Sequence, residues 1–166
     1  SKFSKMKKII ASVLCVGFSM WGFTQTHTEE VDLLQAAFGI EKKEIVKQFV
    51  TPSAETADAF WALYDEYEMA RKENGKKRIE LLNTYAKEYN NLTDAQADEW
   101  TAEVIKLATA TDKLIVTYYN KIKKVTSPRV ATQFYQVENY ILTAVRMEIL
   151  DAVPFVGEPV EIETED

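Results

Sequence analysis

Residues 92–125 read LTDAQADEWTAEVIKLATATDKLIVTYYNKIKKV, and this stretch decides the class of fold. It opens with Leu92, Thr93 and Gln96 at the spacing of a capping box, in which the hydroxyl and the glutamine side chain each satisfy a free amide at a helix start. Large side chains then recur every three or four residues, as on one face of a helix. They are Trp100, Val104, Leu107, Thr111, Leu114, Tyr118 and Val125. The stretch therefore predicts one long helix that ends in a group of lysines, which suit a helix C-terminus.

The residues before this stretch predict a second long helix over 51–91. Thr51 is a capping residue, and Pro52 is of the type favoured at the first helical position. One helical phase is shared by Phe60, Tyr64, Tyr67, Leu82, Tyr85 and Tyr89. Residues 71–78 (RKENGKKR) interrupt this pattern with polar side chains, but Gly75 is the only strong helix breaker among them. We expect one continuous helix, with a turn at 71–78 as the alternative, and an antiparallel hairpin with the next helix.

Two further helices flank this pair. The first is predicted to begin at Thr28 or Glu29, and its apolar period is carried by Val31, Leu34, Phe38, Ile45 and Phe49. The last is predicted to begin at Ser127 and Pro128 and to stop before Pro154. Its predicted buried face holds Val130, Phe134, Val137, Ile141 and Ala144. No strand-like alternation appears, so the expected fold class is all-α: an elongated bundle or hairpin of about four helices, with long middle helices and no sheet.

The first 24 residues have the pattern of a secretory signal peptide. Four lysines precede the uncharged, mostly apolar residues 9–23, which are too few to span a bilayer comfortably as a helix. We expect cleavage after Thr24, with an uncleaved membrane anchor as the alternative. The predicted organisation is a signal peptide at 1–24, a single helical domain at 25–156 and a disordered acidic tail at 157–166.

Cleavage would make the chain strongly acidic and free of cysteine. Four of the 20 basic residues would leave, so that 16 would remain against 26 acidic residues, a net charge of −10. A cysteine-free export product suits the oxidising periplasm, and an acidic field repels nucleic acid. We therefore expect a periplasmic protein with no nucleic-acid partner and with membrane contact only through the transient signal peptide.

The sequence lacks motifs for catalysis or for a cofactor. One histidine and one cysteine are too few for a multi-histidine or cysteine-based metal centre, and no nucleophile elbow or phosphate-binding glycine loop occurs. We expect no catalytic residue, no metal and no cofactor, although Asp65, Glu66 and Glu68 could hold a hard cation weakly. Glu138 and Arg146 lie eight residues apart on the last helix and could pair with charges on other helices. We expect them to form a structural pair or to lie on a solvated face.

Aromatic side chains crowd one side of the predicted second helix. Such a stripe usually packs in a core, but Phe60 and Trp61 are adjacent and cannot both point inward equally. Some aromatic surface is therefore expected to be exposed, as at protein-binding surfaces. We predict a protein-binding site on an aromatic-and-basic face made of Phe60, Trp61, Tyr64, Tyr67 and Arg71.

The segment LTDAQ at 92–96 resembles the LTxxQ motif of the Spy/CpxP-like periplasmic proteins, and the predicted signal peptide, four helices and long middle helices are similar too. The segment from Ser127 to Asn139 looks like the last helix of Bacteroidetes-type members. The resemblance implies a chaperone-like envelope-stress protein that binds unfolded or envelope proteins without ATP, and a homodimer is one form that it implies. It also admits an accessory sensor or modulator of an envelope signalling system. Leu92, Thr93 and Gln96 would then be motif residues at a helix start.

Overall fold

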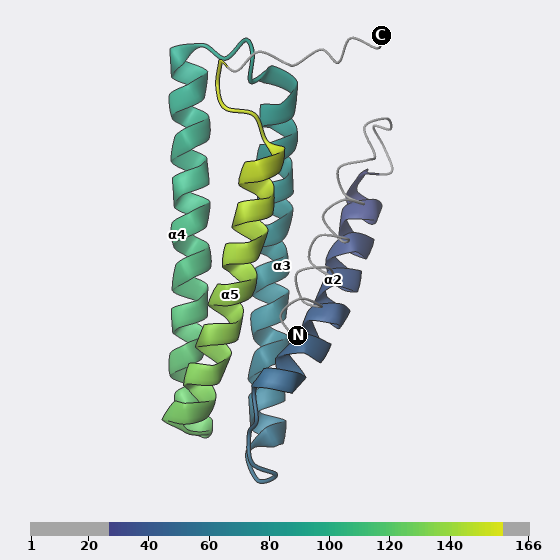
Figure 1. The fold of residues 1–166 in the computed structure, drawn as a ribbon, viewed down its shortest axis with the longest axis vertical. Coiled ribbons are helices and arrows are strands. Elements are labelled where there is room, and N and C mark those ends of the chain that lie inside the picture. The colour runs from purple at the N-terminus through teal and green to yellow at the C-terminus, as the bar shows by residue number, and fades with distance from the viewer. Residues whose placement is uncertain (1–26, 158–166) are drawn as a thin grey trace.

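The computed structural model describes residues 27–157, with side chains from Phe38 onward. Within this range the chain forms α2 (His27–Phe49), α3 (Ala57–Glu88), α4 (Asp94–Val125) and α5 (Pro128–Ala152), with no strand (Figure 1). The expected all-α bundle with long middle helices is confirmed. The predicted signal peptide and all of the acidic tail except Gly157 lie outside the described residues. No helix in the described part of the chain is long and apolar enough to cross a membrane.

The two long helices α3 and α4 form the predicted antiparallel hairpin. Helix α3 runs without interruption through residues 71–78, so the single helix is confirmed and the alternative turn is wrong. Each helix has 32 residues, or about 48 Å at 1.5 Å per residue. The capping box at the start of α4 is confirmed, since the Gln96 amide donates to Thr93 Oγ1 over 3.3 Å and the Thr93 amide donates to Gln96 Oε1 over 3.0 Å.

The predicted start of the second helix at Thr51 and Pro52 is wrong, because α3 begins at Ala57. The Thr51 hydroxyl oxygen, which would cap the helix, accepts instead from Nε2 of Gln133 on α5 over 3.2 Å. A turn follows at residues 53–56, closed by a 3.1 Å hydrogen bond from the Thr56 amide to the Ser53 carbonyl. The capping residue is thus tied to another helix, and α3 starts only after the turn.

The start of α5 is as predicted. Ser127 is the cap and accepts from the Val130 amide over 3.3 Å, and Pro128 occupies the first helical position. After α5 the chain folds back on the end of α3, where the Tyr85 hydroxyl donates to the Pro154 carbonyl over 2.8 Å. A local signal therefore sets the start of the helix, and a contact with α3 holds the chain just after its end.

Helices α4 and α2 lie on opposite sides of the α3–α5 pair (Figure 1). Large side chains fill the space between the helices. The main buried cluster comprises Val46, Val50, Phe60, Tyr64, Tyr67, Ile115, Tyr118, Ile122, Val130, Ala131, Phe134 and Leu142. A smaller group centred on Ile45 and Ile141 joins α2 to α5. Most of the predicted α4 stripe is buried or half-buried, but Val125 at its end is 41% exposed.

Candidate functional site

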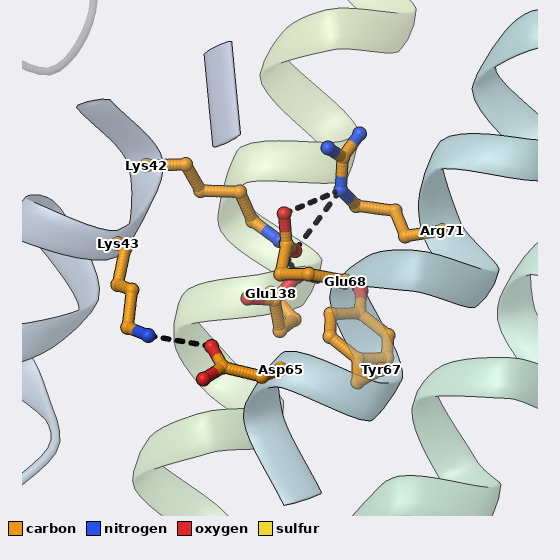
Figure 2. A network of polar contacts seen from close by, with 7 residues as sticks. All are labelled: Lys42, Lys43, Asp65, Tyr67, Glu68, Arg71 and Glu138. Carbon is orange, nitrogen blue, oxygen red and sulfur yellow. Dashed lines mark hydrogen bonds and ion pairs between the residues drawn. The ribbon is translucent and has the colours of Figure 1, made fainter. Parts of the chain in front are cut away.

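A lysine of α2 is buried at the junction of three helices. Lys42 is only 2% exposed, and its ammonium points to carboxylates on α3 and α5 (Figure 2). Lys42 lies four positions after Phe38 and three positions before Ile45, so it shares their helical phase. That phase brings Lys42 to the packed side of α2, where the charge must be paired because an isolated buried charge is costly.

The pairing involves five residues, which we call the Lys42 cluster: Lys42, Tyr67, Glu68, Arg71 and Glu138. Lys42 Nζ contacts Glu68 Oε1 and lies 2.7 Å from Glu138 Oε2. The Tyr67 hydroxyl donates to the same Glu138 oxygen over 2.6 Å, and Arg71 Nε lies 3.0 Å from both oxygens of Glu68. Lys42 Nζ also lies 4.8 Å from the centre of the Tyr67 ring, within the range of a cation–π contact.

The two carboxylates of the cluster have opposite electrostatic environments. Burial raises the pKa of Glu138, and the positive charge of Lys42 offsets this only in part. Burial acts on Glu68 in the same direction, but Lys42 and Arg71 together outweigh it and hold the pKa of Glu68 below its ordinary value. Burial, followed by the nearby charge of Glu138, also raises the pKa of Tyr67. Glu68 is thus the more strongly ionised member of the pair.

The cluster is not fully hydrogen-bonded. Among the described residues, Glu138 Oε1 and the Tyr64 hydroxyl are buried and have no hydrogen-bond partner. A buried polar atom without a partner costs about 1–3 kcal/mol. Helix α2 is therefore held by strong charge pairing within a site that also carries a desolvation penalty.

The predicted aromatic-and-basic face is not an exposed surface. Phe60, Tyr64 and Tyr67 are 0%, 0% and 2% exposed, so the expectation of exposure is wrong for these three residues. Helix α2 covers the face: Lys42 lies on Tyr64 and Tyr67, Lys43 lies 5.5 Å from the Trp61 ring, and Arg71 lies over Phe38. Trp61 and Arg71 remain half-buried. The helical phase of the stripe was recognised correctly, but its partner is another helix of the same chain.

The structure separates the three neighbouring carboxylates that were considered as a weak cation site. Asp65 pairs with Lys43 over 2.5 Å, Glu66 pairs with Lys121 of α4 over 3.5 Å, and Glu68 belongs to the Lys42 cluster. In the described part of the chain, no group of three or more His, Cys, Asp or Glu residues could hold a metal ion.

Glu138 and Arg146 each form a structural pair with a charge on another helix, which is one of the two expected arrangements. Glu138 pairs with Lys42 of α2, and Arg146 Nη2 lies 2.9 Å from Asp112 Oδ1 of α4. Leu92, Thr93 and Gln96 lie at the α3–α4 turn, as a helix start. Sequence reasoning missed Lys42 itself, although its place in the apolar phase of α2 was a usable signal.

The molecule is therefore an all-α bundle in which a buried ionic cluster attaches one helix to two others. A comparison of the chain with protein-family models found no match, and comparisons with curated proteins and with solved structures found none either. The functional argument consequently rests on the residues themselves.

The opposite environments of Glu68 and Glu138 predict opposite pH effects on stability. The Glu68 contribution is present above the ordinary glutamate value of 4.5 and is lost as the pH falls below it, because its folded pKa is lowered. For Glu138, whose folded pKa is raised, the unfolded chain loses its proton first, so its contribution falls as the pH rises above 4.5.

Urea unfolding of Glu68→Gln, Glu138→Gln and the wild type across this pH range measures both effects. We expect the advantage of the wild type over Glu68→Gln to shrink on acidification. We expect the stability of the wild type relative to Glu138→Gln to improve on acidification. Two difference curves with the same slope would contradict the assignment.

Proposed function

We propose that this protein binds unfolded or partner proteins without ATP, as a chaperone-like component of the periplasm. No covalent bond is made or broken in this function. The observation that carries the proposal is a set of exposed apolar side chains on α4 and α5, which we call the apolar seam. It consists of Ile105, Val116, Tyr135 and Leu150.

The members of the apolar seam are large and open to solvent. Ile105 and Leu150 are each 60% exposed, Val116 is 47% exposed and Tyr135 is 41% exposed. Ile105 and Val116 are eleven residues apart, or just over three helical turns, so they share one face of α4. Clustered apolar side chains on a surface are typical of protein-interaction sites.

Two contacts between α4 and α5 support the placement of the seam. The Arg146–Asp112 ion pair crosses the junction, and Asp112 lies on the same face of α4 as Ile105 and Val116. The Tyr119 and Tyr135 rings meet at 5.9 Å farther along the same junction. An apolar strip with an exposed ion pair in its middle suits extended, partly apolar chains better than one rigid partner.

A second candidate function is that of an accessory sensor or modulator in an envelope signalling system. The Lys42 cluster favours it, because a change in charge at a few buried residues would alter how α2 is held against α3 and α5. This role predicts one saturable partner and little general suppression of aggregation.

Light scattering of a chemically unfolded client protein, diluted into the purified protein without ATP, tests the first proposal. We expect near-equimolar wild type to suppress aggregation. The Ile105→Ser/Leu150→Ser variant should lose most of this effect while keeping its helical circular dichroism. Met69→Ser is the matched control, because Met69 is 65% exposed but lies on α3, outside the seam.

If the wild type does not suppress aggregation, the chaperone-like function is contradicted, and the second candidate function, with one saturable partner, is favoured. If the seam variant and Met69→Ser lose the same share of the suppression of aggregation, the protein still binds unfolded clients, but the apolar seam is not the binding site.

A further inference from the structure

In the described part of the chain, helix α2 lies against α3 and α5 over a shorter length than the one along which α3 and α4 run together. In Figure 1 the N-terminal part of α2 diverges from the other helices. The side chains of α2 are described from Phe38 onward, and those of residues 38–50 pack against α3 and α5.

The surface that α2 covers needs a positively charged group from whatever binds to it. Without Lys42, Glu138 would keep only the Tyr67 hydroxyl as a partner among the described residues, inside a buried site. Glu68 would keep Arg71. An occupant of this surface must therefore bring an ammonium group between the two carboxylates, on a helix that also offers apolar side chains to Phe60 and Tyr64.

The connection between α2 and α3 is long enough for α2 to move away from its own bundle. Thr51 follows α2 after a single residue and is tied to Gln133 of α5, so it moves with α2 and can make the same hydrogen bonds on an equivalent surface. The hydrogen bonds recorded for residues 52–56 join Ser53 and Thr56 to each other and lead into α3. Five extended residues span about 17 Å, which allows α2 to leave its own bundle.

We propose that α2 of a second copy of this chain occupies the surface, giving a dimer by reciprocal exchange of α2. Lys42 of each copy is then buried between Glu68 and Glu138 of the other. Every contact of the closed monomer is re-formed in this dimer except those of the connecting segment, so the difference in free energy is small. Exchange of an identical element between protomers is a low-cost route to a dimer.

Protein concentration governs the balance between the two forms. The α2 of the same chain acts at an effective concentration of about 1 mM, as for short linkers in general. Exchange is consequently expected to rise with concentration and to be fastest when the chains refold together, because α2 must detach first. This inference concerns the α2 surface and does not depend on the apolar seam.

Chemical cross-linking tests the exchange in the full-length chain with Cys15→Ser. One variant carries Lys43→Cys on α2 and the other carries Asp65→Cys on α3, since Lys43 Nζ and Asp65 Oδ1 are 2.5 Å apart. The two are unfolded, mixed, refolded at high concentration and treated with a short bis-maleimide. We expect a two-chain product that increases with concentration. The double variant, Lys43→Cys/Asp65→Cys, should cross-link within one chain at low concentration.

The control pair combines Lys106→Cys with Asp65→Cys, because Lys106 is an exposed residue of α4. A two-chain yield no higher than that of this pair would overturn the proposal, as would failure of the double variant to cross-link.

Discussion

Replacement of Lys42 by methionine is expected to lower the free energy of unfolding by about 3–5 kcal/mol. Methionine fills a similar volume but leaves Glu138 without its cation in a site where Lys42 is only 2% exposed. Removal of one partner of a buried pair is costly because the other charge stays buried without compensation. Urea unfolding followed by circular dichroism measures the loss.

Lys43→Met is the matched control for this prediction. Lys43 is adjacent in sequence and also forms an ion pair between α2 and α3, but its partner Asp65 is largely exposed. Exposed pairs contribute at most about 1 kcal/mol. Addition of Glu138→Gln to Lys42→Met should restore part of the stability, because it removes the stranded charge. Equal effects of Lys42→Met and Lys43→Met would show that burial of the pair has no energetic consequence.

Replacement of Phe134 by alanine is expected to cost about 3–5 kcal/mol. Phe134 is fully buried on α5, and its ring meets Tyr67 at 5.2 Å and Tyr64 at 6.5 Å, both in edge-to-face geometry. Alanine would leave a cavity between α3 and α5 and would remove both aromatic contacts. Thermal and urea unfolding measure the effect.

The neighbouring Tyr135→Ala serves as its control. Tyr135 is 41% exposed and belongs to the apolar seam, so its loss should cost much less stability and should instead weaken client binding. The two variants thus distinguish the packing role of Phe134 from the surface role of Tyr135, although the residues are adjacent. A loss of stability in Tyr135→Ala as large as in Phe134→Ala would contradict the burial of one ring and the exposure of the other.

The helices could be predicted because their signals are local. Thr93 with Gln96, and Ser127 with Pro128, satisfy backbone groups within one turn, and these signals do not depend on the rest of the fold. Thr51 with Pro52 carries the same kind of signal, but the prediction from it is wrong. Gln133, 82 residues farther along the chain, donates to the Thr51 hydroxyl oxygen that a cap would use. A cap motif alone does not reveal such a competitor.

The site was harder to predict because it depends on which helix covers which face. The aromatic stripe of α3 was visible in the sequence, but periodicity does not distinguish a surface for a partner from a surface for another helix of the same chain. The position of Lys42 on the apolar face of α2 indicated that this charged side chain would be buried. Its two carboxylates lie 26 and 96 residues farther along the chain, so their meeting point follows only from the packed structure.

That long separation has a consequence for the order of events during synthesis. The α3–α4 hairpin joins neighbouring segments and can form as soon as residue 125 has been made, but Glu138 is added 96 residues after Lys42. At about 5–20 residues per second, that interval is roughly 5–20 s. During this time α2, the first of these helices to be made, has none of its binding surface until α3 has been made, and then only the α3 half. The earliest helix of the bundle is therefore the last to reach its final place.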